Sequence, residues 1–108
     1  MRIPADFKLF SQQWRVRGAQ PGEIGTDLGQ CRPDQLEVIL NPNQTAESLL
    51  ATFWHEVIHA IETKLELEMT ERQVDLVALG IIDLMRNNPT MLESFGYETA
   101  TTGAEDAE

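Results

Sequence analysis

The sequence predicts an α+β fold, in which a small antiparallel sheet from the first 40 residues packs on two or three helices. Two observations support this: apolar and polar residues alternate early in the chain, and apolar residues recur every three or four positions after residue 45. The first period is typical of a half-buried strand and the second of an amphipathic helix. At 108 residues and 42% hydrophobic residues, the chain has the size and composition of one globular domain. We assign residues 1–96 to that domain and residues 97–108 to an acidic tail that we expect to be mobile.

Strands are predicted in two places. Around Trp14 and Val16 apolar and polar side chains alternate, so these two residues share one side of a strand. Further along, two short apolar runs flank Pro33-Asp34, a dipeptide typical of a turn. We therefore expect a hairpin that joins residues 29–31 to residues 36–40.

A long helix is predicted from Ala46 to Leu65, because its apolar residues recur at helical spacing. A second helix is predicted to open at Thr70, where Thr70-Glu71-Arg72-Gln73 has the capping-box pattern, and to end at Asn87-Asn88-Pro89. Residues 91–95 are expected to add a short helical turn.

The charge balance argues against nucleic acid and membranes as direct ligands. The chain has 18 Asp and Glu against 8 Lys and Arg, and a net charge of −10 repels phosphate backbones and anionic lipid headgroups. No apolar stretch approaches the ~20 residues that span a bilayer, and the N-terminus has no apolar run of signal-peptide length. Cys31 is the only cysteine, so no intrachain disulfide can form, and we interpret it as a small buried hydrophobe. We expect a cytoplasmic protein.

The candidate chemistry lies in His55-Glu56-Val57-Ile58-His59, inside the predicted long helix. Residues four apart lie one turn apart on the same helix face, so His55 and His59 can share one zinc ion. Glu56 is expected beside the zinc-bound water and would take its proton as general base, while zinc polarises the scissile carbonyl. The motif therefore predicts zinc-dependent hydrolysis of a peptide bond.

Three features distinguish this motif from a chance string. Its two histidines are the only ones in the chain, and the helical period is supported independently of them. The residues around them on the helix are all uncharged: Thr52, Phe53, Trp54, Val57, Ile58, Ala60 and Ile61. An exposed helix would not surround these polar groups with so much apolar surface.

A third ligand has to be a carboxylate, because the chain has no third histidine. Glu62 stands where the metzincin extension of the motif requires glycine, which excludes that subclass, and its side chain is expected to point past the metal. Glu71 and Asp75 lie four apart on the next predicted helix, so one can bind zinc while the other accepts a histidine ring N–H. A plain antiparallel pair of helices brings Asp75 level with His59, whereas only crossing helices bring in Glu71.

With these residues, the segment from Gly25 to Pro89 resembles the gluzincin class of zinc metallopeptidases. It is similar in particular to compact forms such as the ImmA/IrrE and SprT-like groups and to short phage-encoded metallopeptidases. If the chain is phage-encoded, the expected cytoplasm is that of the host cell. The resemblance implies a minimal zincin-like domain with the following site: His55, His59 and Glu71 as zinc ligands, Glu56 as general base, and Asp75 as the partner that orients a histidine.

The resemblance also implies how a substrate binds. An edge strand, here assigned to residues 36–40, is expected to lie above the site and to hold an extended peptide or protein segment by backbone pairing. The chain departs from larger relatives because it has no evident group to stabilise the oxyanion. Tyr97 or an arginine such as Arg32 offers this chemistry, but nothing in the sequence places either near the zinc.

Two other classes of function compete with hydrolysis. One is a catalytically silent zinc-binding module, which keeps the metal and engages a basic partner through its acidic surface. Glu56 argues against this class, since a structural zinc site needs no base and tends to close with four protein ligands. The other is a metal-free helical interaction domain in which Phe53 and Trp54 are simply core.

Overall fold

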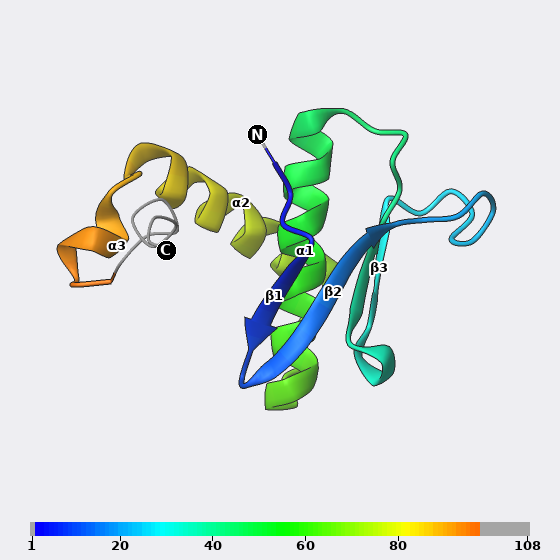
Figure 1. The fold of residues 1–108 in the computed structure, drawn as a ribbon, viewed down its shortest axis with the longest axis horizontal. Helices are drawn as coiled ribbons and strands as arrows, with labels where there is room; N and C mark the ends of the chain where they lie inside the picture. Colours follow the sequence, from blue (N-terminus) through cyan, green and yellow to red (C-terminus); the bar gives the residue numbers. More distant parts are fainter. Residues whose placement is uncertain (1, 98–108) are drawn as a thin grey trace, which may run out of the picture.

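A computed structural model describes residues 2–97, which form the predicted α+β fold from a four-stranded sheet and three α-helices (Figure 1). The elements in chain order are β1 (Asp6–Leu9), β2 (Gln12–Gly18), β3 (Gly29–Arg32), the 3-10 turn η1 (Pro33–Gln35), β4 (Glu37–Leu40), α1 (Ala46–Leu65), α2 (Glu71–Asn87) and α3 (Met91–Ser94). None of the helices within residues 2–97 combines the length and apolar character needed to span a bilayer. The tail predicted from Tyr97 onward lies, apart from Tyr97 itself, outside the described residues.

The sheet is mixed, and the prediction of an antiparallel sheet is wrong for its central pair. The strand order is β1-β2-β4-β3. Strands β1 and β2 pair antiparallel, as do β3 and β4, but β2 and β4 run parallel with Val16 opposite Val38. The chain between β2 and β4 first forms β3 on the far side, and this long connection allows the parallel pairing.

Strand β4 is central, so the prediction that residues 36–40 form the edge strand is wrong. All four of its residues are buried, and Val38 and Ile39 have no exposed surface. Three of the four, Val38 to Leu40, are apolar without alternation, which is typical of a strand covered on both faces. The edge strand next to α1 is instead β3, which pairs only with β4 among the described strands.

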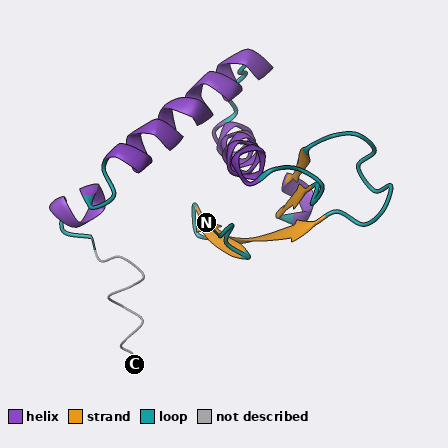
Figure 2. Cartoon of the chain, turned by 90° about the horizontal axis from the view of Figure 1, so that it is seen from above, coloured by secondary structure: helices purple, strands orange, loops and turns teal. Residues whose placement is uncertain are grey.

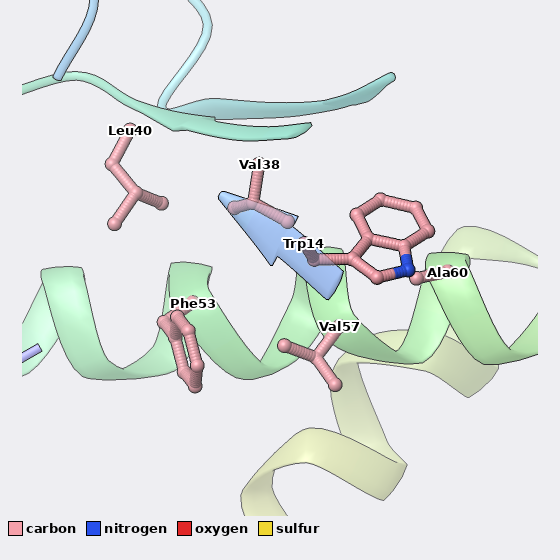
Figure 3. Close-up of a cluster of buried hydrophobic side chains, with 6 residues drawn as sticks. All are labelled: Trp14, Val38, Leu40, Phe53, Val57 and Ala60. Carbon is pink, nitrogen blue, oxygen red and sulfur yellow. The ribbon is translucent and has the colours of Figure 1, made fainter. Parts of the chain in front are cut away.

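Helix α1 lies between the sheet and α2, and it buries residues on both sides (Figure 2). The main core between the sheet and α1 consists of Trp14, Val38, Leu40, Phe53, Val57 and Ala60 (Figure 3). A second cluster of Ile58, Val74 and Ala78 joins α1 to α2. Burying one side chain of Val, Leu or Phe contributes about 1.5–3 kcal/mol, so the two clusters together fix α1 in place.

Gly29 lets the edge strand approach α1 closely. A Cβ atom at this position would lie 2.6 Å from Cγ2 of Thr52 and 3.1 Å from the backbone oxygen of Ile39. Both distances are shorter than van der Waals contact, so any residue larger than glycine would force the neighbouring atoms to shift. The close packing brings β3 alongside the helix face that carries Glu56, whose Cγ would lie 3.3 Å from the same Cβ.

Helix α2 crosses α1 and does not run back along it. In Figure 1 α1 stands upright and α2 runs across behind it, and in Figure 2 α1 is seen nearly end-on while α2 is seen along its length. The predicted capping box is present. The Thr70 side chain accepts the backbone N–H of Gln73, and the Gln73 side chain accepts the backbone N–H of Thr70. The cap fixes the first turn of α2, which begins at Glu71, beside α1.

Candidate metal centre

Three predicted site residues converge on one point. His55 and His59 project from adjacent turns of α1, and their Nε2 atoms lie 3.1 Å apart. Glu71, the first residue of α2, spans both rings: its Oε1 lies 3.1 Å from Nε2 of His55 and its Oε2 lies 3.0 Å from Nε2 of His59. Their ligand atoms all lie within 4.8 Å of one another, so among the described residues these three side chains could together hold a metal ion.

The crossing of the two helices explains why Glu71 and Asp75 take different places. Glu71 faces both Nε2 atoms, whereas Asp75, one turn further along α2, lies on the other side of His55. Its Oδ1 is 2.7 Å from Nδ1 of that ring. Of the two arrangements considered from the sequence, the crossing one is present, and it brings Glu71 to the Nε2 atoms.

Glu62 has an orienting contact that sequence reasoning missed. Its side chain points away from the Nε2 atoms, as expected, and its Oε1 lies 2.9 Å from Nδ1 of His59. Its Oε2 accepts the backbone N–H of Met69 at 2.7 Å. The Met69 amide and, after it, His59 lower the pKa of Glu62, so this carboxyl is ionised at neutral pH. The sequence does carry a signal for this contact: Glu62 follows His59 by three residues on the same helix, and side chains at that spacing lie close together.

The two orienting carboxylates determine where the histidine protons lie. An ionised carboxylate only accepts hydrogen bonds, so Nδ1 of His55 donates to Asp75 and Nδ1 of His59 donates to Glu62. In a neutral ring whose one proton is on Nδ1, the Nε2 atom presents a lone pair, which is the form that binds a metal ion. The two Nε2 atoms and the oxygens of Glu71 lie 3.0 to 3.1 Å from one another, so a cation between them could bind all three side chains.

The spacing fits a small divalent ion. Zinc ligands at about 2.0–2.1 Å in tetrahedral geometry lie roughly 3.3–3.4 Å from one another. The two Nε2 atoms lie 3.1 Å apart and each lies 3.0 to 3.1 Å from one of the two Glu71 oxygens, and with one atom from each residue the group lies within 4.8 Å. Two imidazoles and one carboxylate are also donors that zinc accepts. These three residues therefore fit the zinc ion that the His-Glu-x-x-His motif implies.

Comparisons with known proteins assign this site to no family. No family model matches the chain, and no curated protein or solved structure matches it. What the site can do therefore follows from its own side chains and their geometry.

Glu56 is buried beside the cluster. Only 7% of the residue is exposed, and the described part of the chain provides no hydrogen-bond partner for its carboxylate. Burial raises the pKa of Glu56; the two histidines oppose this rise, while the charges of Glu71 and Asp27 add to it. A carboxylate in this setting binds a proton more readily than an exposed one, which suits a general base.

A cleft of about 700 Å³ opens above these residues. One wall is formed by residues 27–31 and Pro33, and the other by α1, with Glu71 and Asp75 at the side. Cys31 lines the cleft and packs against the core, and burial raises the pKa of its thiol to about 12, so it is protonated at neutral pH.

Neither candidate for an oxyanion stabiliser lines this cleft. Arg32 binds Glu23 at 3.2 Å, a partner that also pairs with Arg17 and does not line the cleft either. Tyr97 follows α3 and is 66% exposed. The described residues therefore offer no arginine or tyrosine for this role.

Proposed function

We propose that this chain is a zinc-dependent metallopeptidase that hydrolyses a peptide bond with metal-activated water. The proposal depends on one observation: the Nε2 atoms of His55 and His59 lie 3.1 Å apart, and each lies 3.0 to 3.1 Å from an oxygen of the Glu71 carboxylate. Three protein ligands leave the fourth zinc position open, as in catalytic sites, whereas structural sites close with four. When bound here, zinc would lower the pKa of a coordinated water to about 7 and polarise a carbonyl oxygen.

The chain's own groups supply the proton transfers and the alignment. Glu56 accepts a proton from water as the water oxygen attacks the carbonyl carbon, and it returns the proton to the amine nitrogen when the C–N bond breaks. Asp75 and Glu62 hold the rings of His55 and His59 by their Nδ1–H groups. Partners of this kind keep each ring in the orientation and protonation state that a ligand needs.

The substrate we propose is an extended peptide or protein segment. Strand β3 has one hydrogen-bonding edge that is not paired within residues 2–97, and it forms a wall of the cleft. A peptide can add to such an edge by backbone hydrogen bonds. This assigns to β3 the role that the resemblance to gluzincins implies for an edge strand. We propose action in the cytoplasm, because a single cysteine without a disulfide fits a reducing compartment. We also propose no direct binding of nucleic acid or membranes, because of the net charge of −10.

A second candidate is a catalytically silent zinc-binding module for regulation or protein interaction. One observation favours it: none of the residues that line the cleft within residues 2–97 is Lys, Arg or Tyr, so no such side chain can stabilise an oxyanion. Zinc itself can take this role by binding the carbonyl oxygen, so we place the hydrolase first.

The deciding experiment compares the wild type with Glu56→Gln. Both proteins are purified without a histidine tag and analysed for zinc content and for cleavage of a peptide library. We expect one zinc in each and a loss of cleavage of about 100-fold or more in the variant. Glu68→Gln, which changes an exposed carboxylate between α1 and α2, is the matched control and should keep both. Unchanged cleavage in Glu56→Gln contradicts the mechanism, and zinc without cleavage in the wild type favours the silent module.

A further inference from the structure

The charged groups that line the cleft are all acidic. They are Asp27, Glu56, Glu71 and Asp75, and no Lys or Arg accompanies them within residues 2–97. Glu71 and Asp75 are engaged with the histidine rings, and Glu56 is buried beside them. Asp27 is the carboxylate of this lining that the metal centre does not use.

Asp27 is available to a ligand. It is exposed, it stands on the β3 side of the cleft, and its one side-chain contact is the Gln30 amide at 3.4 Å. No cation pairs with it among the described residues. It nevertheless lines the same cleft as Glu56 and the proposed ligands.

The backbone around Asp27 is held in place, so its side chain always starts from the same point beside the cleft. Its N–H donates to Ile24 at 3.1 Å, and its carbonyl oxygen accepts from the Asn41 side chain at 3.2 Å. The carbonyl oxygen of the next residue, Leu28, accepts from the backbone N–H of Asn41 at 2.8 Å and from the Gln44 side chain at 2.9 Å. A group positioned before binding loses less conformational entropy when it pairs with a ligand.

We propose that Asp27 makes this cleft selective for peptides with a lysine or arginine side chain close to the scissile bond. The inference depends on the proposed function, because it names the substrate class of the same site. An ammonium or guanidinium group that reaches Asp27 would make a charge-assisted hydrogen bond with a carboxylate that no Lys or Arg of the cleft lining competes for. An acidic side chain at the same position would meet the like charge of Asp27.

The test uses peptides that differ only in one side chain, with lysine, norleucine or glutamate at each position around the scissile bond. The measured quantity is the ratio of kcat/KM for the lysine and norleucine peptides. We expect a ratio of about five in the wild type at one position, as for a partly exposed ion pair, and a ratio near one in Asp27→Asn. Asp83→Asn removes the same charge from the exposed face of α2 and should keep the wild-type ratio.

Further outcomes separate this inference from the proposed function. Asp27→Lys should make the glutamate peptide the better substrate. Cleavage of norleucine and lysine peptides at equal rates overturns the inference and leaves the hydrolase intact. Equal losses in Asp27→Asn and Asp83→Asn overturn it as well, because they indicate a general charge effect. If no peptide is cleaved, peptide affinities of the zinc-loaded wild type and Asp27→Asn decide the question, and equal affinities for the lysine peptide overturn it.

Discussion

The carboxylate of Glu62 lies 2.9 Å from Nδ1 of His59 and holds that ring with its Nε2 atom toward Glu71. The same carboxylate accepts the backbone N–H of Met69, two residues before Glu71. One side chain therefore connects a proposed ligand on α1 with the turn that presents the proposed ligand on α2. The metal centre and the junction of the two helices share this contact.

Removal of the Glu62 carboxylate should weaken zinc binding without removing a ligand. We expect Glu62→Ala to lower zinc affinity by about 10- to 100-fold, the usual effect of losing a partner that orients a metal-binding histidine. Glu62→Gln should fall between this variant and the wild type, because its one oxygen can satisfy only one of the two contacts. Competition with a chromophoric chelator measures the affinity, and Glu68→Ala is the control. Equal affinities in Glu62→Ala and the wild type would show that the contact does not support the metal.

Glu71 and Asp75 should differ in what their loss does to the metal. Glu71 faces both Nε2 atoms, so Glu71→Ala removes a proposed ligand and should lower zinc affinity by more than about 100-fold. Asp75→Asn removes a contact to Nδ1 of His55 and should cost about 10- to 100-fold. The same chelator competition ranks the two variants. The reverse order would exchange the roles assigned to the two carboxylates.

The elements that could be predicted from the sequence are those set by local signals. The bounds of α1 match the predicted Ala46 to Leu65, because seven apolar residues at helical spacing mark it without reference to the rest of the chain. The capping box at Thr70 was predicted because its residues lie within one turn of each other. The histidine pair follows from the same helical geometry.

What could not be predicted depends on contacts between distant segments. The parallel pairing of β2 with β4 joins residues about 20 positions apart, and alternation of side chains does not encode strand direction. The turn between β1 and β2 uses Phe10 and Ser11 at φ values of 49° and 68°, although residues other than Gly and Asn rarely adopt this conformation. The choice between Glu71 and Asp75 depended on the crossing of two helices, which is set by packing around Val74 and Ala78.

The buried carboxyl of Glu56 should make the stability of the metal-free protein depend on pH. Burial raises its pKa above the ordinary value of 4.5, so the folded protein keeps this proton to a higher pH than the unfolded chain does. The contribution of Glu56 to the free energy of unfolding therefore falls as the pH rises from about 4.5 through the pKa of Glu56 in the folded protein. Above that pKa the contribution no longer changes. Glu56→Gln cannot ionise, so in chelator-treated protein it should be more stable than the wild type, with a difference that grows over this window.

Urea denaturation from pH 4.5 to pH 8 measures this difference. Glu93→Gln changes an exposed carboxylate on α3 and should show no such trend relative to the wild type. A constant difference between Glu56→Gln and the wild type across the range would mean that burial does not affect the ionisation of Glu56.

The packing of β3 on α1 gives a prediction that concerns space alone, because the φ angle of Gly29 is not in the left-handed region. Gly29→Ala would place its methyl group 2.6 Å from Cγ2 of Thr52, and overpacking of this kind costs about 1–3 kcal/mol of unfolding free energy. Thr52→Ser removes that methyl group and keeps the hydroxyl that donates to Gln44 at 3.1 Å, so the double variant should recover part of the loss. Gly18→Ala on β2, where the nearest atom is the Leu40 oxygen at 4.0 Å, is the matched control. Urea denaturation of the four variants measures these differences, and equal stabilities of Gly29→Ala and Gly18→Ala would mean that β3 does not depend on this close approach.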